Sequence, residues 1–263
     1  MSWWLFPPAT REVQFDEKWS FVGKKEKHCD RDDPADDSCG DHWDHVALDA
    51  EHRLVLSVVP GRQAPEHTLE LVQDVHRRTG GQPLDLFTSD ENPAYAAALL
   101  EVYGEVKQPR RKGRRGRKPQ PVKVPPAALR YATVHKTREN NRVVQVETRV
   151  VYGTKAAVQE ALDNSAVSEA VNTVFVERHN GTDRNRNARK VRKTYCFSKD
   201  WEVHEAVTYF TVYSYNFCWP VRTLRQGSRR KGYRQRTPAM AAGLTDHIWT
   251  LTEWLSYPVV QRK

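Results

Sequence analysis

Alternating hydrophobic and polar residues predict three strands at the start of the chain. Residues 11–23, REVQFDEKWSFVG, alternate and include Asp16. Two further alternating stretches, 42–50 and 52–61, are separated by a short polar turn. The pattern predicts an antiparallel meander from residue 12 to 60.

The next segments change to a helical period and then back to a strand. Apolar residues at helical spacing predict a helix over 64–80, and the apolar run 83–90 predicts a strand that ends on Asp90. A second helix is expected from Pro93 to Gly104. Strand, crossover helix and strand are typical of an α/β fold, in which catalytic groups tend to lie at strand ends.

The second half of the chain is predicted to contain one hairpin and several helices. Residues 128–153 alternate around a turn at 139–141, and residues 155–171 have a helical pattern. We expect helical structure again after Asn172, continuing over 178–193, and a further helix over 198–219, whose aromatic stripe we interpret as core packing. This stripe consists of Trp201, Ala206, Tyr209, Phe210, Tyr213 and Phe217. The segment 236–255 reads as a helical region opened by proline, with an amphipathic tail.

The charge balance indicates a polyanionic partner. The net charge is +9 and the isoelectric point is about 9.4, with the excess concentrated in the middle of the chain and in 178–193. Residues 107–126 are basic and lack hydrophobic periodicity, so we expect them to be disordered when free. We interpret this segment as a phosphate-binding arm; a solvated linker is the alternative. Its basic residues are Arg110, Arg111, Lys112, Arg114, Arg115, Arg117 and Lys118.

Cysteine usage and hydropathy indicate a soluble cytoplasmic protein. The four cysteines are scattered, no signal-peptide pattern is visible, and no apolar run approaches the roughly 20 residues of a membrane span. The acidic segment 24–41 is predicted to be a surface loop. Zinc ligand types occur in and beside it, but Cys-x9-Cys is not a recognised spacing, so a mobile solvated loop is the favoured reading. These residues are His28, Cys29, Cys39 and His42, with His45 nearby.

In the segment 172–199, the acidic residue Glu177 is surrounded in sequence by basic residues. At the helical period, Glu177 shares a face with Asn180, Gly181, Arg184 and Ala188. Basic residues flank this face, namely Arg178, Arg186, Arg189, Lys190, Arg192 and Lys193. Glu177 is either a salt-bridged surface carboxylate, which base rates favour when it is considered alone, or a metal ligand beside a polyanion.

Five motifs together resemble the DDE transposases of the insertion-sequence-one type, which are prokaryotic mobile-element enzymes with an RNase H-like core. The motifs are QFDEKWSFVG, FTSDENPAY, FVERHNGTDRNRNARKVRKTYCFSK, YNFCWP and RTPAMAAGLTD. The resemblance covers residues 12 to 250 and is most specific at the third motif. The sequence departs from the family in the acidic 24–41 segment and in the long basic arm with its hairpin, and no zinc-ribbon or helix-turn-helix pattern precedes the first acid.

The resemblance implies that Asp16, Asp90 and Glu177 are the catalytic acids. They would bind two Mg²⁺ or Mn²⁺ ions, which suit carboxylate oxygens, and their carboxylates should converge on one accessible spot. Arg184 occupies the place of a basic residue that the family usually carries on the same helix face. The implied fold is α/β, an RNase H-like mixed sheet flanked by helices. Its expected parts are a first core part (1–106), a basic arm and hairpin insertion (107–153), the catalytic helix with the end of the core (154–219) and a basic helical tail (220–263).

The resemblance also implies a reaction and a partner. The expected activity is metal-dependent cleavage at element ends and transfer of the 3′-hydroxyl into target DNA, by a homo-oligomer bound to double-stranded DNA. Besides the arm, the expected DNA contacts are Arg178, Asn180, Arg184, Arg186, Arg189, Lys190, Arg192 and Lys193. The alternative is a non-catalytic DNA-binding fragment or a domesticated transposase that acts as a binding or regulatory protein.

Overall fold

A mixed six-stranded sheet forms the centre of the protein, in the strand order β3-β2-β1-β4-β7-β8. The computed structural model describes residues 10–30, 32–109, 119–140 and 142–257. The first three strands form the predicted antiparallel meander, β4 and β7 run parallel to β1, and β8 returns antiparallel to β7. The strands of this sheet are β1 (Glu12–Val22), β2 (Gly40–Asp49), β3 (Leu54–Gly61), β4 (Leu86–Asp90), β7 (Tyr131–Glu139) and β8 (Arg142–Tyr152).

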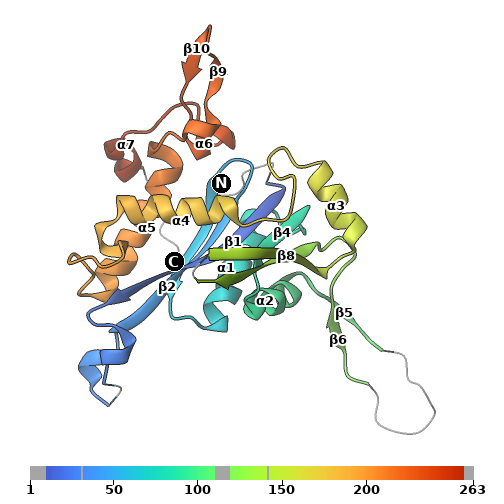
Figure 1. Ribbon diagram of the computed structural model, residues 1–263, viewed down its shortest axis with the longest axis horizontal. Coiled ribbons are helices and arrows are strands. Elements are labelled where there is room, and N and C mark those ends of the chain that lie inside the picture. Colours follow the sequence, from blue (N-terminus) through green and yellow to red (C-terminus); the bar gives the residue numbers. More distant parts are fainter. Residues whose placement is uncertain (1–9, 31, 110–118, 141, 258–263) are drawn as a thin grey trace.

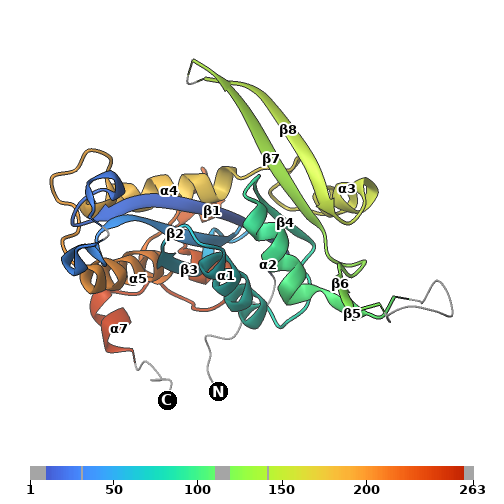
Figure 2. The ribbon, with the colours of Figure 1, turned by 90° about the horizontal axis from the view of Figure 1, so that it is seen from below.

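Helices cover both faces of the sheet. Figure 2 shows α4 on one side of β1 and α1 and α2 on the other. The longest helix, α5, packs along β3, where the Asn216 amide accepts a hydrogen bond from Val55 N and donates one to Val55 O. The Asn216 side chain thereby satisfies the N–H and C=O groups of Val55 on the edge strand β3, which could otherwise pair with a strand of another chain. The helices in these layers are α1 (Pro65–Arg78), α2 (Pro93–Tyr103), α3 (Lys155–Asp163), α4 (Val174–Arg186) and α5 (Trp201–Cys218).

The alternation of β1 separates an apolar face from a polar one. Val13 and Phe15 enter the core against α1 and α2, and the Phe15 ring stacks on Tyr95 at 5.0 Å between centroids. The opposite side of the strand presents Gln14, Asp16 and Lys18 to α4. Because two strand residues rise by about 6.6 Å and one helical turn by about 5.4 Å, successive side chains on β1 can each meet a successive turn of α4.

That polar ladder fixes the position of α4. Gln14 Oε1 accepts hydrogen bonds from the backbone N–H groups of Phe175 and Val176 at 3.0 and 3.2 Å, which are unpaired donors of the first helical turn. One step along, Asn180 donates to Asp16, and after it Lys18 pairs with Asp183. The ladder holds α4 in a defined register over β1, and Glu177 is carried with it.

Two predicted helices end earlier than the sequence pattern indicated. The helix expected over 155–171 stops at Asp163, and the helix expected to continue to Lys193 stops at Arg186. At the second stop Asn187 is extended, and its side chain accepts a hydrogen bond from Arg189 N to begin a short 3-10 turn, Ala188–Lys190. Asn often competes with the helical backbone in this way.

The hairpin described as part of an insertion belongs to the sheet. β7 pairs with β4, so residues 131–152 extend the core rather than leave it. Within the segment expected to be disordered, Val122–Val124 (β6) pairs with Glu105–Lys107 (β5) in a small ladder that projects from the body (Figure 1). The basic residues 110–118 lie outside the described residues.

The C-terminal part is less helical than expected. A second small hairpin, β9 (Gln226–Ser228) with β10 (Gly232–Arg234), precedes two short helices, α6 (Pro238–Ala241) and α7 (Leu251–Ser256). Further 3-10 turns are Glu26–His28, Pro34–Asp36 and Arg222–Leu224. Within the described residues, no helix combines the length and the apolar composition needed to cross a bilayer.

The aromatic stripe of α5 is only partly a core face. Phe217 is buried, but Phe210 is 37% exposed. The buried face of the helix is largely polar, and it includes His204, Thr208, Thr211, Ser214 and Asn216. These polar groups bond to several neighbours: Asn216 binds the Val55 backbone, His204 contacts Ser20 and Ser198, and Thr208 accepts from a buried lysine described below.

Candidate active site

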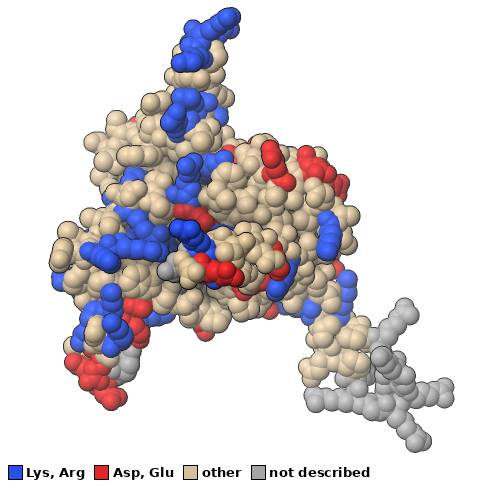
Figure 3. Space-filling model, viewed as in Figure 1, with Lys and Arg blue, Asp and Glu red and all other residues tan. Residues whose placement is uncertain are grey.

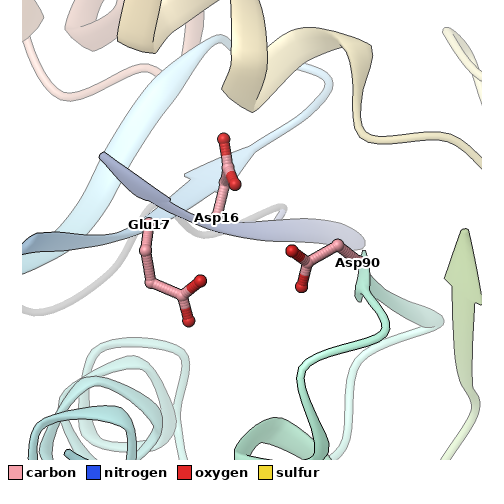
Figure 4. Close-up of side chains that lie close together, drawn as sticks. All are labelled: Asp16, Glu17 and Asp90. Atoms are coloured by element: carbon pink, nitrogen blue, oxygen red, sulfur yellow. The ribbon is translucent and has the colours of Figure 1, made fainter. Parts of the chain in front are cut away.

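Three carboxylates meet where β1 passes the end of β4. Gln14 pairs with Thr88 in the parallel ladder between β1 and β4. Asp16 and Asp90 each lie two residues further along these strands. Oxygen atoms of Asp16, Asp90 and Glu17 lie within 4.8 Å of one another, and they form the one such potential metal-binding group among the described residues. Figure 4 shows Asp16 and Glu17 leaving β1 in opposite directions with Asp90 beside them.

Asp16 is a half-buried carboxyl that accepts one side-chain hydrogen bond. Asn180 Nδ2 donates to its Oδ2 at 2.8 Å. Burial, together with the charges of Asp90 and Glu177, raises the pKa of Asp16 to about 6 despite that hydrogen bond. The surroundings therefore stabilise the negative charge of this carboxylate poorly. A bound cation would stabilise it.

Glu17 is an acid that the sequence analysis did not single out. Its side chain is 6% exposed, and Asn92 Nδ2 donates to its Oε1 at 2.7 Å. Burial and the charge of Asp90 raise the pKa of Glu17 to about 7. Strand alternation places Glu17 on the face of the sheet opposite to Asp16, so the sequence pattern gave no reason to group the two acids. They belong to one site because Asp90 lies close to both.

Glu177 reaches the same cavity from α4. It lines a cavity of about 530 Å³ together with Asp16 and Asp90, although it lies outside the tight group of three. Thr173 Oγ1 donates to Glu177 Oε1 at 2.6 Å, and Lys136 of β7 forms an ion pair with the same oxygen. Burial raises the pKa of Glu177, but the hydrogen bonds from Lys136 and Thr173 outweigh it, and the pKa lies below its usual value.

The donor set fits hard divalent cations. The site offers carboxylate oxygens from the adjacent strands β1 and β4 and from the facing helix α4. Carboxylate oxygens are the ligands that Mg²⁺ and Mn²⁺ prefer. The raised pKa values of Asp16 and Glu17 reflect burial and like-charge repulsion, which a divalent ion would relieve. The residues present therefore suit a metal at this position.

The predicted DNA contacts divide into accessible and inaccessible groups. Arg184 and Arg192 line the acidic cavity with Lys136 and Arg138, two basic residues that the sequence analysis did not select. Arg178, Arg192 and Lys193 are exposed and Arg189 is half-buried. Figure 3 shows Lys and Arg side chains gathered over α4 and along β9–β10.

Three predicted contacts have other roles in the structure. Lys190 is 3% exposed and forms an ion pair with Asp44, and Asn180 is 2% exposed and holds Asp16, so neither is available to DNA. Arg186 donates to Thr211 O at 3.2 Å and lies 4.6 Å from the Trp219 ring centroid. For Lys190 the sequence pattern misled because it treated residues 187–193 as a continuing surface helix, whereas α4 ends at Arg186.

A buried network of two lysines and two aspartates connects β1, β2 and α4. Asp44 accepts from Lys18 at 3.0 Å and from Lys190, and Lys18 also pairs with Asp183. The side chains of Lys18, Asp44 and Lys190 are 0% exposed. Thr208 of α5 also accepts from Lys190, which accounts for one polar residue on the buried face of that helix.

The zinc candidates do not form a comparable group. Among the described residues, no set of three or more metal-ligating side chains includes His28, Cys29, Cys39 or His42. The His42 ring instead stacks on Trp201, with centroids 4.3 Å apart.

The raised pKa of Asp16 predicts a pH-dependent stability of the metal-free protein. Burial raises the pKa of its carboxyl from an ordinary value near 3.8 to about 6, so the folded state binds more protons than the unfolded state between these pH values. Stability should therefore fall as pH rises toward 6, by about 3 kcal/mol for a two-unit shift. Urea unfolding in EDTA at pH 4 and pH 7 measures it. Asp16→Asn should flatten the profile, and an unchanged profile in that variant would contradict the assignment.

No protein-family model matches this chain, and no curated protein matches it.

Proposed function

We propose that this protein is a DNA transposase that cleaves phosphodiester bonds with divalent metal ions and transfers the freed 3′-hydroxyl into target DNA. The observation that supports this most strongly is the shared cavity, in which acids from β1, the end of β4 and α4 lie beside basic side chains. The mixed sheet, with an antiparallel meander beside the parallel strand β4, is compatible with an RNase H-like core.

Each part of the site has a role in this proposal. Asp16, Asp90 and Glu177 would hold two Mg²⁺ or Mn²⁺ ions, which when bound activate water and neutralise charge on the attacking and leaving oxygens. Asn180 holds the Asp16 carboxylate through its 2.8 Å hydrogen bond. Arg184 and Arg192 would contact the phosphates next to the scissile bond. Lys136 forms an ion pair with Glu177. A cation bound by Glu177 would take the place of Lys136, whose ammonium group would then contact a phosphate.

A nicking assay tests the proposal directly. Purified protein is incubated with supercoiled plasmid in Mg²⁺, in Mn²⁺ and in EDTA, and the relaxed form is quantified. We expect nicking in either cation and none in EDTA. Plasmid binding without nicking in either cation would favour the non-catalytic alternative, a DNA-binding fragment or domesticated protein.

The basic arm should contribute sequence-independent affinity for DNA. Its seven basic side chains between residues 110 and 118 would contact phosphates and release counterions. Replacing Arg110, Arg111, Lys112, Arg114, Arg115, Arg117 and Lys118 with Ser or Gly should weaken binding to unrelated duplexes about equally. It should also lower the slope of log K against log salt by several units, at roughly 0.9 per lost contact.

Titration of one duplex across a salt series, for both proteins, measures this effect. The melting temperature should not fall, because a polar segment of this kind adds little to the core. Parallel slopes for the two proteins would show that the arm is a passive linker.

A further inference from the structure

A second cavity lies on another side of α4. It has a volume of about 340 Å³. Val174, Arg178 and Thr182 of α4 line it, whereas Glu177, Asn180 and Arg184 line the acidic cavity. Phe175 of α4 lines it too, and its other walls come from Arg53 in the turn between β2 and β3, from Tyr215 and Trp219 at the end of α5, and from Arg222 beyond it. The two cavities are therefore separate sites that share one helix.

Two buried polar groups on the wall of this cavity lack partners among the described residues. His179 is 3% exposed, and neither of its ring nitrogens has a hydrogen-bond partner. Nη1 of Arg53 is also buried without one. Buried polar groups are nearly always hydrogen-bonded, so unpaired groups beside a cavity indicate a ligand that supplies their partners.

The cavity is suited to an anion. Arg53, Arg178 and Arg222 line it, and no Asp or Glu does. Burial lowers the pKa of Arg53 although the charges of Asp49 and Glu12 oppose this effect, and Arg178 places a second positive charge near it. The Arg53 guanidinium carbon lies 3.6 Å from the Phe175 ring centroid. A guanidinium that stacks on an aromatic ring keeps its N–H edge free for bidentate binding of a phosphate.

The remaining wall is suited to a flat ring. Tyr215 and Trp219 lie beside apolar Leu48 and Val221. Burial lowers the pKa of His179 to about 4, so at neutral pH the ring offers one N–H donor and one acceptor. Aromatic side chains stack on nucleobases, and a donor and acceptor pair can read a base edge.

We propose that this cavity binds a single nucleotide, with its phosphate on Arg53 and Arg178 and its base against Tyr215 and Trp219, hydrogen-bonded by His179. The nucleotide is either a free mononucleotide or an unpaired residue of a DNA strand, since both present the same chemistry. The site is additional to the proposed cleavage and needs no metal ion.

Calorimetric titration in EDTA tests the site with three probes: dTMP, thymidine and inorganic phosphate. We expect dTMP to bind at least about tenfold more tightly than either fragment, because only dTMP engages both walls. Arg178→Gln should weaken dTMP binding at least about tenfold, as the loss of a charged hydrogen bond predicts. His179→Phe, which keeps the ring packed on Tyr215, should weaken it about fivefold or more. Arg229→Gln, an exposed arginine outside the cavity, is the charge-matched control and should bind as the wild type does.

Equal affinity for dTMP and inorganic phosphate would overturn the proposal, and so would unchanged dTMP binding in Arg178→Gln. A competition arm identifies the source of the nucleotide. Displacement of dTMP by a short single-stranded oligothymidine but not by a blunt duplex assigns the cavity to an unpaired DNA residue, and no displacement by either assigns it to free nucleotides. Because no divalent ion is present, these results do not depend on whether the protein cleaves DNA.

Discussion

Asp90→Asn should abolish metal-dependent nicking while DNA affinity stays equal or rises slightly. Asp90 ends β4 beside Asp16, and its carboxylate is exposed in the acidic cavity. In the proposed site, the amide would remove a charge that binds the cation and repels phosphate. Mutation of a residue that only hydrogen-bonds to a metal ligand typically lowers metal affinity or activity about 10–100-fold. Loss of a ligand itself should therefore reduce the nicking rate by more than about 100-fold.

The measurement combines nicking rates in Mg²⁺ with duplex affinity in EDTA. Asp85→Asn is the matched control, because Asp85 directly precedes β4 with its side chain 41% exposed, but it pairs with Arg11 and does not line the cavity. It should retain wild-type nicking. Full nicking in Asp90→Asn would remove Asp90 from the site, and equal losses in both variants would point to a general effect of charge.

Asp44→Ala should destabilise the fold by about 3–5 kcal/mol, the usual result of leaving buried charges without a partner. Asp44 is the one acid that contacts both buried lysines in the network of described residues. Without it, Lys190 loses its carboxylate partner and Lys18 keeps only Asp183. Burial already lowers the pKa of Lys190 to about 8, so the cost of its desolvation is only partly offset in the native protein.

Chemical denaturation at neutral pH measures this loss. Glu101→Ala is the matched control, since Glu101 pairs with Lys123 at the surface with its side chain 57% exposed, and its removal should cost no more than about 1 kcal/mol. A loss in Asp44→Ala as small as that in the control would show that the buried network is not important for stability. Because the network anchors α4, the stable fraction of Asp44→Ala should also show weaker nicking.

Local periodicity in the sequence determined much of the fold. The meander, α1, β4, α2, the β7–β8 hairpin and α5 all have apolar residues at the spacing of their own element, so each was predicted near its observed bounds. The resemblance implied that Asp16 and Asp90 would be neighbours if the first and fourth strands pair as in an RNase H-like sheet, and β1 and β4 do pair. Helix ends at Asp163 and Arg186 were missed, since a polar helix pattern continues past both.

Only the tertiary structure decided which charged residues act in a site and which hold the fold together. Lys190 appears in the sequence as one more basic residue in a basic segment, yet its partner Asp44 is 146 positions away and both are buried. The pairing of Lys136 with Glu177 and the approach of Glu17 to Asp90 depend in the same way on contacts across the sheet. Hydrophobic periodicity records which side of an element faces the core, but an ion pair between distant segments has no local period. The roles of these charged residues therefore became visible only when folding brought their partners together.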